Sequence, residues 1–166
     1  VYNGTGYDYG EDLQNRVLNI WNNVIGGPVR FTVSTNSNSP VKFILDDTLG
    51  PNVAGCSDTF WRNYEIYKSE ISINPKVLGL YSINKIENLC LHEFGHTIGL
   101  AHSSDGGLMD YSNGYDMNEI KDPLKKVVYA LYQQPVGDQL AIVLDQEDYQ
   151  EEIPSSGHIH FEYPMP

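Results

Sequence analysis

The sequence predicts a single α+β domain in which a helix packs on a small twisted mixed sheet. The chain has 166 residues, which is one domain by length and enough to close a hydrophobic core. Apolar side chains recur at helical spacing over residues 11–24, whereas residues 29–33 and 41–45 alternate apolar and polar side chains as strands do. A helix followed by two strands is typical of a small sheet with a backing helix.

The first elements follow from these patterns and from the residues that interrupt them. Residues 1–10 are rich in Tyr, Gly and Asp without a period, so we expect an extended arm. The helix from Glu11 should end at Gly26-Gly27-Pro28, because this run cannot continue a helix. Val29–Val33 and Val41–Leu45 are the two strands that follow.

The middle of the chain contains a turn, a strand and a helix start. Asp46 and Asp47 lie in a loop that either binds Ca²⁺ or is a plain turn that needs no ion. Glu70–Ile73 reads as a strand. Ser82 or Asn84 is suited to cap the next helix.

That helix carries the pattern His92-Glu93-x-x-His96, followed by Gly99 and His102. Two histidines four residues apart lie on one helix face, which is the spacing two nitrogen ligands need to reach one zinc ion. Gly99 lets the helix end and the chain turn back, so that His102 becomes a third ligand. Three protein ligands leave the fourth zinc position open for water, and Glu93 lies beside it as a base.

This extended motif, with Met109 seven residues after His102, resembles the metzincin clan of zinc endopeptidases and most closely its matrixin branch. The likeness covers most of residues 11–132. It implies a metzincin-like zincin fold with a methionine turn and a C-terminal helix. It also implies a secreted metalloprotease with one catalytic Zn²⁺, in which Glu93 assists attack of zinc-bound water on peptide bonds of proteins.

The resemblance implies roles for further residues, and in places the chain departs from the family pattern. Tyr111 stands where astacins and serralysins carry a tyrosine that steadies the oxyanion, and it is either an auxiliary catalytic residue or a packing residue. Residues 52–61 fall where metzincins carry the edge strand that pairs with substrate; otherwise they are a loop ending in core aromatics. Phe60, Trp61 and Tyr115 are candidates for specificity pockets. No histidine precedes His92, so the second, structural zinc of matrixins is not expected.

The last part of the chain extends beyond the family pattern. Residues 117–132 are predicted to form a helix, with Pro123 in its first turn or at a kink. We assign residues 1–132 to the catalytic domain and residues 133–166 to an extension packed on it. Leu140–Leu144 is suited to a strand. His158–Tyr163 alternates strictly, and its polar face either holds a second metal, leans towards the active cleft or faces water.

The net charge limits the classes of partner that we expect, and the two cysteines allow two alternatives. The net charge is -12, which disfavours nucleic acid and membrane surfaces as partners. The resemblance implies protein or peptide substrates, and we expect a monomer. Cys56 and Cys90 form either one disulfide or two buried free thiols. Two alternatives to an active protease remain: a latent protease whose tail, residues 133–166, occupies the cleft, and a non-catalytic zinc-binding interaction module.

Overall fold

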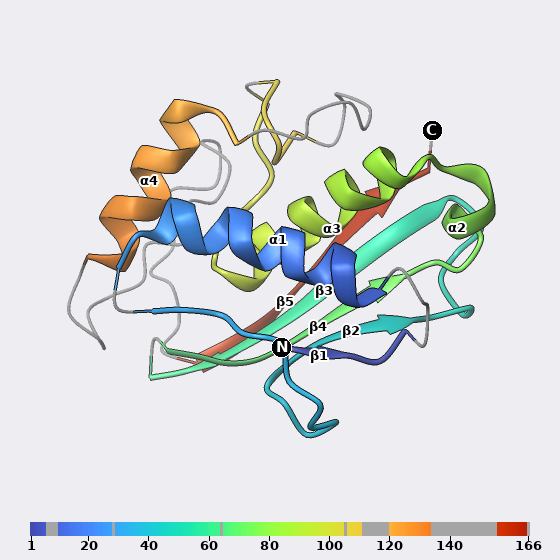
Figure 1. Cartoon of the computed structure of the whole chain (residues 1–166), viewed down its shortest axis with the longest axis horizontal. Coiled ribbons are helices and arrows are strands. Elements are labelled where there is room, and N and C mark those ends of the chain that lie inside the picture. Colours follow the sequence, from blue (N-terminus) through green and yellow to red (C-terminus); the bar gives the residue numbers. More distant parts are fainter. Residues whose placement is uncertain are drawn as a thin grey trace.

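A computed structural model of the protein describes residues 1–5, 10–27, 29–63, 65–104, 106–110, 120–133 and 156–165. The fold is α+β, with a five-stranded mixed sheet and helices that lie on one of its faces (Figure 1). The elements are β1 (Tyr2–Asn3), α1 (Gly10–Ile25), β2 (Val41–Leu45), β3 (Val53–Arg62), β4 (Glu65–Ile73), α2 (Val77–Leu80), α3 (Ile83–Thr97), α4 (Asp122–Tyr132) and β5 (Ser156–Pro164).

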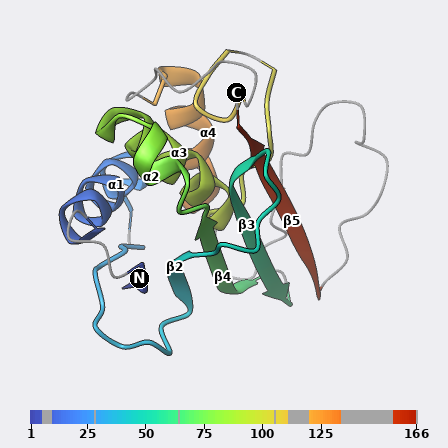
Figure 2. The same ribbon diagram turned by 90° about the vertical axis from the view of Figure 1, so that its right-hand side faces the viewer.

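The strands follow the order β1-β2-β4-β3-β5 across the sheet. β1, β2 and β4 are parallel, while β3 runs antiparallel to β4 on one side and to β5 on the other. Viewed from the end of the molecule, β5 forms the outer edge beyond β3, and the helices stand on the same side of the sheet (Figure 2). The last described strand is therefore a neighbour of a strand about a hundred residues earlier in the chain.

Helix α1 is the predicted backing helix, and its apolar stripe is the reason that it packs. Val17, Trp21 and Ile25 recur at helical spacing and are fully buried. Trp21 also donates a hydrogen bond from its indole nitrogen to the carbonyl of Leu91 on α3, at 3.1 Å. The helix ends where Gly26 takes a positive φ of 58°, a backbone conformation that glycine adopts without steric cost. The hydrogen bond from Trp21 to Leu91 fixes α1 against the helix that carries the histidines.

The strand predicted at residues 29–33 is wrong: this segment forms no ladder with any strand that the structure describes. Its backbone bonds instead to a side chain and to the chain terminus. The side-chain amide of Asn22 accepts from the Phe31 N–H and donates to the Phe31 carbonyl, each at 2.8 Å. The Val1 amino group donates to the carbonyl of Thr32 at 2.7 Å. These bonds satisfy the backbone that a neighbouring strand would otherwise pair.

Other strand predictions differ from the structure in extent. The strand Val41–Leu45 is confirmed as β2. Residues 1–10 are not only an arm, because Tyr2–Asn3 pair with β2 as β1. The strand predicted at Glu70–Ile73 begins earlier, at Glu65, because its N-terminal half pairs with β3 across a tight turn.

Residues 52–61 form a strand, β3, but they are not at a sheet edge. β3 lies between β4 and β5, and its outer backbone groups pair with the chain's own C-terminal strand. The expected exposed edge is therefore corrected: within the described residues the edge beyond β3 is β5. β3 and β5 are far apart in the sequence, so the local pattern of residues 52–61 did not predict that they pair.

The remaining elements close the domain around the site. The loop at Asp46 is closed by its own side chain, since the carboxylate accepts hydrogen bonds from the Thr48 N–H at 2.9 Å and the Thr48 hydroxyl at 2.6 Å. Pro123 lies in the first turn of α4, where its missing N–H costs nothing. The strand predicted at residues 140–144 lies outside the described residues. Within the described residues, no helix combines the length and the apolar content needed to cross a membrane.

Candidate metal centre

Helix α3 is buried along most of its length, which places its histidines in the interior. Its N-terminus is capped by Ser82, whose hydroxyl accepts a hydrogen bond from the Lys85 N–H at 3.4 Å, as one of the two sequence candidates predicted. From Asn88 to Thr97 every side chain is buried, because the helix lies between α1 and the sheet. His92 and His96 are each only 1% exposed.

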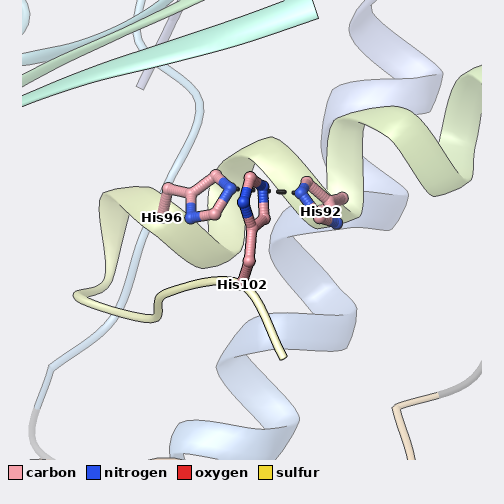
Figure 3. Close-up of side chains that lie close together, drawn as sticks. All are labelled: His92, His96 and His102. Carbon is pink, nitrogen blue, oxygen red and sulfur yellow. Dashed lines mark hydrogen bonds between the residues drawn. The ribbon is translucent and has the colours of Figure 1, made fainter. Parts of the chain in front are cut away.

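The chain reverses at Gly99 and returns His102 towards α3. Gly99 has φ of 94°, and the Leu100 N–H after it donates back to the carbonyl of Gly95 at 3.0 Å. A side chain at this position would be strained, so glycine is what lets the helix stop and fold back here. His102 then comes beside His92 and His96, and the three rings converge (Figure 3).

The geometry of the three rings fits a single metal ion. One nitrogen atom from each of His92, His96 and His102 lies within 4.8 Å of the other two. The Nε2 atoms of His92 and His96 are 3.1 Å apart. Two nitrogens that each lie about 2.0–2.1 Å from one zinc ion are roughly 3–3.4 Å apart, so this pair is spaced as zinc ligands are.

The other ring nitrogens show which tautomer is present. Nδ1 of His92 lies 2.7 Å from the carbonyl of Leu108, and Nδ1 of His96 lies 2.7 Å from the carbonyl of Leu100. A carbonyl can only accept, so each Nδ1 donates its hydrogen, and Nε2 of the neutral ring is left with a bare lone pair. Such outer hydrogen bonds are the usual support of metal-binding histidines.

Burial keeps these rings neutral. It lowers the pKa of His92 to about 3 and that of His96 well below its usual value, although the backbone carbonyls act in the opposite direction. Neutral imidazole is the form that binds a metal. Two neutral rings with lone pairs facing each other repel, so the arrangement is one that a cation would stabilise.

Glu93 is the least exposed side chain of the site. It is 0% exposed, and neither carboxyl oxygen has a hydrogen-bond partner within the described part of the chain. Burial raises the pKa of Glu93 well above its usual value. Its Oε1 faces β3, since a Cβ at Gly55 would lie 3.4 Å from it. A buried carboxyl group with a strongly shifted pKa is a candidate for a functional residue.

Met109 lies beneath the helix and explains a glycine within the motif. It is 2% exposed, and a Cβ added at Gly95 would lie 2.5 Å from its sulfur. Side chains do not pack that closely, so the methionine occupies the space that any larger residue at position 95 would need. Met109 also accepts at its carbonyl from the Ser103 N–H at 3.0 Å, which ties the returning segment together.

Strand β5 covers the histidines with aromatic side chains. The ring of Phe161 stacks on that of His96, with centroids 4.0 Å apart and an interplanar angle of 11°, and lies 5.2 Å from His102. The ring of Tyr163 meets that of His92 edge to face at 4.4 Å. Sequence reasoning did not identify Phe161 and Tyr163 as site residues. The signal was the alternation itself, whose apolar rather than polar face turns to the site.

The polar face of β5 points away from the histidines and forms a second cluster with β3. Nε2 of His158 lies 2.7 Å from Oδ1 of Asp58, and Nδ1 of His160 lies 2.8 Å from the same oxygen. Cys56, Asp58 and His160 also have ligand-type atoms within 4.8 Å of one another. His158 and His160 are exposed, so the polar face of this extra strand faces water rather than the three-histidine site.

Several other predicted residues lie elsewhere. Tyr111 and Tyr115 are outside the described residues. Phe60 stacks on His158 on the outward face, with centroids 4.3 Å apart, so it does not line the histidine site. Trp61 is 8% exposed and packs closely against Gly157 of β5.

Cys56 and Cys90 are free and buried, so of the two alternatives the structure has free thiols rather than a disulfide. Burial raises the pKa of each thiol to about 12. Neutral buried thiols behave as small apolar groups, and neither is set up as a nucleophile.

Neither a scan against models of known protein families nor a search of curated proteins finds a match for this chain. The three-histidine site, the buried glutamate and the strand that covers them are therefore the basis for a functional proposal.

Proposed function

We propose that this chain is a zinc-dependent endopeptidase of the metzincin clan, most like the matrixin catalytic domain. One observation carries the proposal: three histidines from one helix and its return loop converge with metal-ligand spacing, next to a buried glutamate. The α+β fold, the glycine reversal and the methionine under the helix support the same class. Most members of the clan are secreted, and we propose the same for this chain.

The metal would be held by His92 and His96 of α3 and by His102. When bound, zinc supplies a Lewis acid that acidifies water and polarises a carbonyl. The protein fixes the rings of His92 and His96, because the carbonyls of Leu108 and Leu100 hold them by their Nδ1 atoms. Rings that are already oriented lose little entropy when the metal binds.

Glu93 would act as general base and then as general acid. In the first step its carboxylate accepts a proton from the water that attacks the scissile carbonyl. In the second step the carboxylic acid donates this proton to the departing amine. Burial raises the pKa of Glu93, which favours the acid of the second step and opposes the carboxylate of the first. A cation bound by the neighbouring histidines would favour the carboxylate. Proton transfer of this kind contributes about 10²–10⁴-fold to a rate.

The substrate would be an extended segment of protein beside β3, in the place that β5 holds in this structure. Glu93 faces Gly55 of this strand, so a peptide along the outer edge of β3 passes the carboxyl group. Pairing with strand backbone recognises an extended chain with little dependence on its sequence. The net charge of -12 favours neutral or basic substrates.

The experiment compares the zinc-loaded protein with its Glu93→Gln variant on an unbiased peptide mixture, with products read by mass spectrometry. We expect internal cleavage by the parent, and a rate about 10²–10⁴-fold lower in the variant, while both bind one zinc. A non-catalytic zinc-binding module would bind zinc and release no product in any form of the chain. Equal cleavage by parent and variant would also reject the proposed mechanism.

A further inference from the structure

We propose that β5 is a tethered, peptide-like occupant of the substrate groove, so that this conformation is a latent form of the enzyme. We further infer that the groove accepts an extended peptide with aromatic side chains at the places of Phe161 and Tyr163. The inference rests on the proposed function, because it names the regulation and the ligand class of the same site.

The backbone of β5 takes the edge that a substrate would need. It pairs antiparallel with β3 from Val53–Pro164 to Arg62–Ser156, with one irregularity near Gly55. Each residue on a strand edge offers its N–H and C=O to one neighbour only. While β5 is in place, a second peptide cannot add to this edge of β3.

Aromatic side chains of β5 pack on the rings of His92 and His96, while His102 is half-buried. Phe161 lies flat on His96, and Tyr163 stands against His92. Tyr163 is also paired with Gly55, the residue that Glu93 faces, so β5 passes directly over the buried carboxyl group. The exposure of His92, His96 and Glu93, at most 1% each, means that water and substrate do not reach them in this state.

Side chains on the outward face of β5 hold this strand against β3. One carboxylate oxygen of Asp58 is hydrogen-bonded to both His158 and His160, and the ring of His158 stacks on that of Phe60. These contacts are at the surface and do not touch the three histidines of the metal centre. They can therefore be weakened or replaced without altering the proposed catalytic residues.

Release of β5 would be a local event. Among the strands that the structure describes, β5 pairs with β3 alone, and its side chains alternate between exposed and half-buried up to Tyr163. An edge strand with few buried side chains opens at a lower free energy than the central strands. The groove would then be free for an added peptide.

A disulfide staple tests whether β5 must leave. Glu162 is exposed and stands opposite Cys56 in the β3–β5 register, so Glu162→Cys places two thiols on neighbouring strands. Directly paired strand positions lie within the Cα separation that a disulfide accepts, about 4.4–6.8 Å. Glu162→Ser is the matched control without the thiol. The probe is acetohydroxamate, and its binding is followed in the visible spectrum of the cobalt(II)-loaded protein.

The oxidised Glu162→Cys variant should bind acetohydroxamate at least tenfold more weakly than its reduced form, and the reduced form should match Glu162→Ser. The full-length Asp58→Asn variant, which loses the charge that holds both histidines, should bind it several-fold more tightly than the parent. Equal binding by the oxidised and reduced forms would overturn the inference and leave the proposed function standing. Acetohydroxamate binding that depends on the staple, with no peptide cleavage by any variant, would support the blocking of the site by β5 and reject the proposed peptidase function.

Discussion

Nε2 of His92 lies 3.1 Å from Nε2 of His96, while the Nδ1 atom of each ring donates to a backbone carbonyl. The two lone pairs therefore face each other inside the protein, where burial holds the pKa of both rings below their usual values. A shared cation resolves this repulsion. This relationship is the physical basis for the proposed zinc site and for the predictions below.

Zinc should bind at one ion per chain and stabilise the fold. A ligand at a thousand times its dissociation constant adds about 4.1 kcal/mol to the free energy of unfolding. Equilibrium dialysis and thermal unfolding with and without zinc measure the two effects. His102→Ala removes one of the three ligands and should weaken zinc binding by more than about 100-fold, since loss of an outer-shell partner alone costs roughly 10–100-fold. Unchanged affinity in this variant would exclude His102 as a ligand.

Gly99→Ala should impair zinc binding without a change in any ligand. Gly99 has φ of 94°, which an alanine adopts at a cost of about 1–2 kcal/mol. Relaxation of that strain moves the return segment that carries His102, so zinc affinity and stability should fall together. Gly79→Ala is the control, because nothing lies within 4 Å of its added Cβ. An alanine at position 99 with parental zinc affinity would show that the reversal does not position His102.

Gly95→Ala should destabilise the fold by about 1–3 kcal/mol, as overpacking of a core does. In an unobstructed helix the same change would stabilise by roughly 0.5–1 kcal/mol. The difference comes from Met109, whose sulfur lies 2.5 Å from the added Cβ. Chemical denaturation of both single variants and of Gly95→Ala/Met109→Ala gives the coupling between the two positions. Additive effects would mean that the methionine does not set the requirement for glycine.

The sequence identified the site more completely than the surroundings of the site. The motif spacing, Gly99 and the Ser82 cap are local signals, and the structure has each in the predicted place. The strand predicted at residues 29–33 failed because Asn22 provides its hydrogen bonds, a contact that periodicity does not encode. The pairing of β5 with β3 was equally hidden, since strand partners about a hundred residues apart leave no mark on the local pattern.

The docking of β5 should weaken as pH rises. Partial burial lowers the pKa of His160, but the hydrogen bond and charge of Asp58, with a smaller contribution from Glu162, outweigh it, and the net pKa is raised. Because the pKa of His160 is higher when β5 is docked, protonation of His160 stabilises docking. This stabilisation is fully present below the ordinary histidine pKa of about 6.5 and is lost as the pH rises through the raised pKa.

Amide hydrogen exchange in β5, corrected for its intrinsic pH dependence, measures this effect. Protection should fall above neutral pH, and His160→Gln should flatten the change. The other titratable groups near His160 are Cys56 and Asp58 on β3 and His158 and Glu162 on β5. Protection that is independent of pH in the parent would show that His160 does not contribute to the hold.

The most direct test of the account is peptide cleavage by zinc-loaded Asp58→Asn, compared with the same variant carrying Glu93→Gln. The first change loosens β5 from outside the site, and the second removes only the proposed base. We expect internal cleavage of a peptide mixture by Asp58→Asn at a rate above that of the parent. The added Glu93→Gln should reduce that rate by about 10²–10⁴-fold. Zinc-loaded Asp58→Asn that cleaves no peptide faster than its Glu93→Gln partner would contradict the account.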